Sequence, residues 1–311
     1  MLKPDVNAID QATRSFAVRG SWFFEDIIGS GLISFVGGIR WLLEHIPWAL
    51  FILTVFFLGW KVRGKLKSGI LYATLLFLVG VVGLWSLMLM TLSIVIASVL
   101  IALALGFPLG VLISGSDRAN QIVRPVLDTM QTMPVFVYLI PALLFFGMGS
   151  ASAVIATVVY AIVPVIRLTS LGIRQVDADV VEAARAFGST RWQTLIKVQI
   201  PQALPTIMTG VNQTLMMAMS MVVTCSMIGA RGLGNEVLIA VNRTEIGRGL
   251  ISGSSVVVLA VILDRLTQGW FSKDKATAPS SGWRNILRKG NSSDEYAYPG
   301  DIKETAGELD G

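Results

Sequence analysis

The charged residues best placed to do chemistry lie in one stretch, VEAARAFGSTRWQTLIKVQIP at residues 181–201. It carries Glu182, Arg185, Arg191 and Lys197 in a chain that is otherwise largely apolar. Catalysis would need paired carboxylates, or a Ser/His/Asp or Cys/His set, held where water is excluded, and the sequence offers none. We therefore expect these charges to dock the chain onto a surface and not to catalyse a reaction.

Other chemistry is limited by composition. The single Cys225 excludes an internal disulfide, and the single His45 leaves no histidine-based metal or catalytic cluster, so we expect both to be structural. No GxxxxGK[ST] phosphate loop occurs, so nothing in the sequence is typical of ATP binding. We expect a chain that is not an enzyme, holds no cofactor or metal, and receives its energy from a partner.

The elements that position this stretch are those of an integral membrane protein. The chain has 311 residues, is 53% hydrophobic and 14% charged, against roughly one-quarter charged in soluble domains. Its net charge of +5 could indicate a nucleic-acid partner, but the basic residues lie in short clusters between apolar runs and not on one face. We expect a lipid bilayer and no nucleic acid as surroundings.

The apolar runs predict an all-α fold of about seven transmembrane helices. A run of fifteen residues with Trp48 and Trp60 at its ends is the shortest of them. The predicted spans cover residues 46–60, 69–87, 89–114, 133–149, 151–170, 205–228 and 254–271. We divide these into two accessory helices over 46–88 and a five-helix core over 89–271.

The basic stretch KVRGKLK at 61–67 predicts the orientation, because short basic loops favour the cytoplasm. Counting spans then places loops 115–132 and 171–204 and the C-terminus inside, and the N-terminus outside. The loop 229–253 departs from this bias, because it should be external yet carries three arginines. Asp264 and Arg265 are expected to mark the cytoplasmic end of the last span.

The two ends of the chain differ from the core in composition. Residues 1–45 form an N-terminal extracytoplasmic segment, and within it 20–45 predicts an interfacial helix, with an irregular packed segment as the alternative. Residues 272–311 are rich in Ser, Gly and charge, and we expect a disordered cytoplasmic tail.

The charged stretch at residues 181–201 predicts two short helices with a hinge at Gly188. The alanines at 183, 184 and 186 favour helix, and Ser189 and Thr190 can cap a second helix. Trp192, Leu195, Ile196 and Val198 give that helix an apolar face, and we expect Pro201 to end or kink it. From the residues alone, this pair could rest on the inner leaflet or in the groove of a partner protein.

The motif itself resembles a known signature. EAARAFG, nine further residues and then VQIP are similar to the EAA loop of ABC-importer permeases, with Val198 and Ile200 in place of the commoner Ile and Leu. In that family the loop is the coupling helix that sits in a groove of the cytoplasmic ATPase. The resemblance implies this role for Glu182, Ala183, Ala184, Gly188, Val198, Ile200 and Pro201.

Further stretches narrow the resemblance. LDTMQTMPVFVYLIPALLFFGMG, PTIMTGVNQTLMMAMSMVV and VILDRLTQ resemble the membrane subunits of glycine betaine/proline betaine uptake systems. This implies a type I (MetI-like) fold in a bacterial inner membrane and a homodimer around a pore. It also implies an external binding protein and two ATPase subunits that bind ATP and Mg²⁺. The implied substrates are glycine betaine, proline betaine, choline, carnitine or trimethylamine N-oxide.

A translocation path needs weak, replaceable contacts, because tight binding would stall a passing solute. Methionines and small polar groups in the run 205–228, with the start of 133–149, satisfy this, although methionine packing in a helix bundle is the simpler explanation for any one of them. The predicted pore and gate residues are Met133, Phe136, Tyr138, Asn212, Met217, Ser220, Met221 and Thr224. An ion-coupled secondary transporter or channel is the alternative, disfavoured by the scarcity of acidic residues within the spans.

Overall fold

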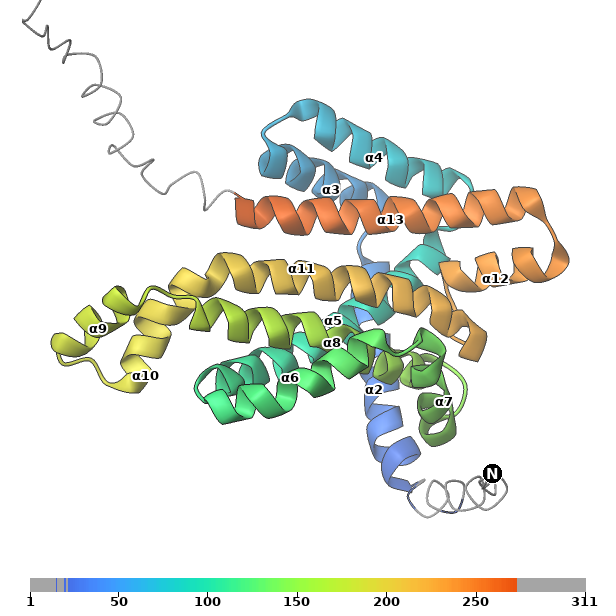
Figure 1. The fold of residues 1–311 in the computed structure, drawn as a ribbon. Helices are drawn as coiled ribbons and strands as arrows, with labels where there is room; N and C mark the ends of the chain where they lie inside the picture. Colours follow the sequence, from blue (N-terminus) through green and yellow to red (C-terminus); the bar gives the residue numbers. More distant parts are fainter. Residues whose placement is uncertain (1–14, 16–19, 21, 273–311) are drawn as a thin grey trace, which may run out of the picture. The chain divides into compact units, whose positions relative to one another are not determined.

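The computed structural model describes residue 15, residue 20 and residues 22–272, and every regular element in that part of the chain is helical (Figure 1). The predicted all-α membrane fold is confirmed. The predictions for residues 1–14 and for the tail beyond residue 272 lie outside the described residues.

Three long helices form the centre of the core. Helices α5 (Trp85–Ser114) and α11 (Ile200–Thr224) each pack along α8 (Ser150–Arg174), as Figure 1 shows. Gly106 and Gly110 of α5 make the approach to α8 possible, because a Cβ on Gly106 would lie 2.4 Å from Val165 Cγ1 and one on Gly110 2.7 Å from Thr169 Cβ. This GxxxG spacing lets two membrane helices meet closely.

The helix that the sequence predicted over residues 20–45 is present. Residues 22–45 are helical throughout, as η1 (Trp22–Gly29) and α2 (Ser30–His45), and α2 packs on α5 and α8. With 24 residues this segment has the length and apolarity of a membrane span, but Figure 1 shows α2 running across the direction of α8, α11 and α13, so the interfacial position stays a prediction. The scattered charges that suggested an interface include Arg40 and Glu44, which pair with each other one helical turn apart.

The two predicted accessory spans are short. Helices α3 (Trp48–Arg63) and α4 (Leu66–Val81) pack together as a hairpin, and each has 16 residues, or about 24 Å of helix, against roughly 30 Å of hydrocarbon. The predicted boundary at residue 88 is wrong, because the chain turns at residues 82–84, where Gly83 has a φ of +83°, and α5 begins at Trp85.

A helix occupies the predicted loop 115–132. Helix α6 (Asp117–Thr132) begins after the Ser116 cap, and its arginine and aspartate content led to the prediction of a loop. Ion pairs Arg167–Asp128 and Arg174–Asp117 tie α6 to α8. Helix α7 (Val135–Phe146) then bends away from α6 by 96°.

The predicted external loop 229–253 is also largely helical. After η3 (Cys225–Ile228), helix α12 (Leu233–Arg243) precedes α13 (Ile246–Ser272). Arg248 donates to Glu236 Oε2 from Nη2 at 2.6 Å and to Glu245 Oε2 from Nη1 at 3.3 Å. The positive charge that conflicted with the orientation rule is therefore largely neutralised within the loop.

Five described helical segments are long and apolar enough to cross a membrane, or six if the bent pair α6–α7 is one span. The prediction of about seven spans differs because it counted α3 and α4 as full crossings and left residues 22–45 out. The predicted helical hairpin of 133–149 and 151–170 is present as α7 and α8, joined at residues 147–149.

Candidate functional site

The coupling loop, residues 177–201, is built by local capping. Helix α9 (Ala178–Ala186) begins at Asp177, whose carboxylate accepts the Asp179 N–H at 3.0 Å. It ends before Gly188, whose φ of +83° strains any residue but glycine. Thr190 and Gln193 then form a reciprocal capping box at the start of α10 (Arg191–Thr194). The predicted pair of helices with a break at Gly188 is confirmed.

The coupling loop has one packed face and one open face. Val181 and Thr194 are buried, and Leu195 packs against the apolar cluster of Ile173, Ala203 and Ile207. Phe187 is 92% exposed and Trp192 66% exposed. Because exposed aromatics of this size are typical of binding surfaces, the open face is a candidate docking site.

The charged side chains of the coupling loop lack ion-pair partners among the described residues. Within the described part of the chain, Glu182, Arg185, Arg191 and Lys197 form no ion pair, whereas Arg167 and Arg174 next to them do. Glu182, Arg185 and Arg191 line a cavity of about 600 Å³ between the loop and the ends of α5 and α8. The loop therefore presents both signs of charge to whatever covers it.

Of the two outcomes predicted for Pro201, to end or to kink the second helix, the structure excludes the first. The chain continues from α10 through a wider turn, η2 (Leu195–Gln199), into α11, where Pro201 occupies the first turn. Proline, which has no backbone N–H to donate, is tolerated in the first turn of a helix. Of the other predicted loop residues, Ala183 is exposed, and Ala184, Val198 and Ile200 are half-buried.

The second candidate site is an exposed face of α11. Five side chains at helical spacing share it and are exposed, and a sixth is half-buried. They are Pro205, Thr209, Gln213, Met216 and Ser220, followed by Thr224. The hydroxyls of Thr209, Ser220 and Thr224 donate to carbonyls one turn earlier in the same helix. They are thus satisfied without an outside partner and suit weak, replaceable contacts.

Three of the predicted pore residues pack inside the chain and do not lie on this exposed face. Met221 is fully buried, and Met217 packs against the core, so the methionine pair at i and i+4 faces inward. Tyr138 is also buried: its hydroxyl donates to the Met130 carbonyl, and its ring packs edge-on against Tyr160. Which face of a helix packs depends on its neighbours, and the sequence did not show them. Sequence reasoning missed Thr209 and Gln213, although their spacing to Ser220 was visible.

The remaining predicted pore residues differ in their exposure and contacts. Phe136 on α7 is 55% exposed, Met133 packs partly on the core, and Asn212 on α11 bonds sideways to Asp264 on α13. Cys225 is buried beside Thr157. No group of three or more metal-ligating side chains occurs among the described residues. Figure 1 shows α9 and α10 at one end of α11, so the candidate docking loop and the exposed face of α11 belong to consecutive parts of the chain.

Comparison with known proteins decides the family. Residues 102–271 match the model of the binding-protein-dependent transport system inner membrane component. The chain belongs to this family. The matched range contains both candidate sites and leaves α2, α3 and α4 outside it.

Relatives of this permease family are similar over most of their length. The chain is 46% identical to the glycine betaine/carnitine transport permease protein GbuB of Listeria monocytogenes, over 81% of the chain and 91% of the relative. It is 44% identical to the glycine betaine transport system permease protein OpuAB of Bacillus subtilis, over 88% and 96%. It is 43% identical to the glycine betaine/proline betaine permease protein ProW of Escherichia coli, over 80% and 70%.

Solved structures agree on the fold. A chain of the MetNI methionine ABC transporter, in an inward-facing conformation, aligns with a TM-score of 0.51 and 27% identity over 63% of this chain and 93% of that one. The MetI-like core expected from the sequence is therefore shown, and the chain is a multi-pass membrane permease subunit.

Proposed function

We propose that the chain is the pore-forming subunit of an ATP-driven importer for a betaine-type osmolyte, in a bacterial inner membrane. The observation that carries the proposal is the coupling loop, which has two exposed aromatics and four charged residues that form no ion pair with other described residues. Proteins rarely leave such a surface uncovered. An ATPase is the partner that the EAA signature implies, and the chain has no phosphate loop of its own.

The substrate class follows the relatives. GbuB, OpuAB and ProW are named for glycine betaine, carnitine or proline betaine, and relatives at 37% and 38% identity for trimethylamine N-oxide. All of these solutes carry a methylated nitrogen. The mild polar face of α11 suits such solutes, because it offers hydroxyl, amide and thioether groups and no fixed charge.

The assembly we propose has two copies of this chain, with their α11 faces toward a shared path. Two ATPase subunits, which bind ATP and Mg²⁺, cover the coupling loops, and a substrate-binding protein docks on the opposite side. The coupling loop then lies in the cytoplasm, as does the α3–α4 turn, which carries the basic residues at 61–67. With residues 22–45 along the outer surface, as the sequence predicts, the proposed N-terminus is outside and the C-terminus is cytoplasmic.

Reconstitution in liposomes tests the proposal. We expect uptake of radiolabelled glycine betaine only when this chain, its ATPase, its binding protein and internal ATP are all present. Gradient-driven uptake by this chain alone would establish the ion-coupled alternative instead. A complex that hydrolyses ATP but accumulates none of the methylated solutes would overturn the substrate class while leaving the permease role intact.

A further inference from the structure

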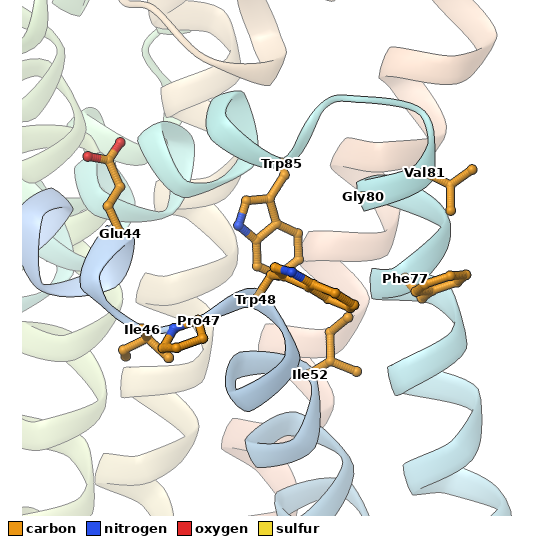
Figure 2. Close-up of a pocket in the computed structure, with 9 residues that line it drawn as sticks. All are labelled: Glu44, Ile46, Pro47, Trp48, Ile52, Phe77, Gly80, Val81 and Trp85. Carbon is orange, nitrogen blue, oxygen red and sulfur yellow. The ribbon is translucent and has the colours of Figure 1, made fainter.

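A cavity of about 590 Å³ lies away from both candidate sites, where the α2–α3 and α4–α5 junctions meet (Figure 2). Its lining includes Trp48 of α3, Phe77 and Gly80 of α4, Trp85 of α5 and Glu44 of α2. Four helices thus contribute to one site, which we call the junction pocket, and three of them lie outside the range matched by the family model.

The walls of the junction pocket are aromatic and ordered by their neighbours. Trp85 is braced by Phe51, whose ring meets it edge-on with 5.5 Å between centroids. Trp48 is 59% exposed and Phe77 49% exposed, so their ring faces remain accessible. In Figure 2 the Trp48 and Trp85 rings lie in the middle of the group, with Phe77 on the α4 side and Glu44 on the α2 side.

One carboxylate, paired with an arginine on the same helix, lies at the edge of the pocket. Among the described residues that line it, Glu44 is the one ionisable side chain, and none is a lysine or arginine. Arg40 holds Glu44 Oε1 at 2.7 Å from the neighbouring turn, and Oε2 accepts no hydrogen bond from the described residues, in a side chain that is 41% exposed. Aromatic faces next to one carboxylate suit a weakly hydrated, apolar cation better than an anion.

We propose that the junction pocket binds a methylated ammonium group. Cation–π attraction from Trp48, Trp85 and Phe77 would hold the methyl groups, and Glu44 would supply the opposite charge at the rim. The choice of ligand rests on the proposed function, because betaine-type solutes carry this group. A lipid with a choline headgroup carries it too, and an apolar groove of about 380 Å³ between α3 and α4, which also includes Trp48 and Phe77, would accept its acyl chain.

The test uses the purified full chain in a maltoside detergent, without ATP or partners, and measures choline binding by saturation-transfer NMR. The matched ligand is the neutral isostere of choline, in which carbon replaces the quaternary nitrogen. We expect choline to bind at least about fivefold more tightly than this isostere. Equal binding of the two ligands would overturn the proposal, because burial of apolar surface alone would then explain it.

Variants locate the site. Trp48→Leu and Trp85→Leu remove a ring but keep an apolar side chain, and each is expected to weaken choline binding about fivefold. Gly80→Leu places a side chain in the cavity next to Trp85, where a Cβ would first meet Trp85 Cε3 at 3.7 Å, and is expected to weaken choline binding more than about fivefold without removing a wall. Trp60→Leu, at the other end of α3, is the control that should bind as the parent does. Unchanged binding in Trp48→Leu and Gly80→Leu would place choline elsewhere and refute the site.

Two further ligands separate the sources of the ammonium group. Tighter binding of a short-chain phosphatidylcholine than of glycine betaine would assign the pocket to lipid, and the reverse order would assign it to the solute. Because binding is measured on the isolated permease, a failure of solute uptake in the full complex would not affect this result. Conversely, normal uptake with no choline binding would refute the pocket and leave the proposed function standing.

Discussion

The side-chain amide of Asn212 on α11 donates a hydrogen bond of 3.1 Å to Asp264 on α13. Gln268 donates to the same carboxylate oxygen at 2.6 Å, and Asp264 is 16% exposed. The sequence predicted Asp264 as a marker of the cytoplasmic helix end and Asn212 as a pore residue. The contact joins the two residues as a polar link between two membrane helices, where unpaired polar groups are costly.

This link predicts a non-additive effect on stability. Asn212→Leu and Asp264→Leu should each lower the thermal unfolding temperature of the purified permease, because each leaves a partly buried polar group short of a partner, at a cost of about 1–3 kcal/mol. The double variant should lose less than the sum of the two, since neither group is then stranded. Gln213→Leu, the same amide-to-leucine change at the exposed position next to Asn212 on α11, is the control. Strict additivity would contradict a direct coupling.

Gly188 should be required for coupling and not for insertion. Gly188→Ala adds a Cβ at a φ of +83°, which costs about 1–2 kcal/mol and tilts α9 against α10. Gly188→Pro and Glu182→Lys should abolish substrate-stimulated ATP hydrolysis by the complex. Gly64→Ala imposes the same backbone strain at a φ of +65° in the α3–α4 turn and serves as the matched control. Normal uptake by the Gly188→Pro and Glu182→Lys variants would remove the coupling role.

Met216, and not Met217, should face the second copy. In a Cys225→Ala background, Met216→Cys is expected to crosslink between copies with a short bifunctional thiol reagent, because Met216 is 40% exposed on the α11 face. Its yield should change when the complex is trapped with ATP. Met221→Cys, at a fully buried position, should remain unreactive in the folded protein. Equal yields at Met216 in resting and trapped complexes would argue against α11 as the moving lining of the path.

Features set by local sequence could be predicted, whereas features set by contacts between helices could not. The helix break at Gly188 was predictable, because a glycine turn followed by the Thr190 and Gln193 capping box is specified locally. Helix α6 was not, since Asp117 and Asp128 look like loop residues until Arg174 and Arg167 of α8 are placed beside them. Likewise, Met221 and Ser220 are adjacent in sequence, and only the packing of α8 against α11 decides which one is buried.

The contact between α5 and α8 gives a final prediction, on stability alone. Gly110→Val should destabilise the permease severely, because even a Cβ at this position would lie 2.8 Å from the Ile166 carbonyl oxygen, which cannot rotate away. Overpacking of this kind costs about 1–3 kcal/mol or more, because helices must separate to relieve it. Gly38→Val on α2, where an added Cβ would have no atom outside its own helix backbone within 4 Å, is the matched substitution with the same change in helix propensity. Thermal unfolding monitored by fluorescence size-exclusion should therefore separate the two variants. A Gly110→Val permease as stable as Gly38→Val would mean that α5 and α8 do not meet at this glycine, and that the GxxxG spacing of Gly106 and Gly110 has no part in their packing.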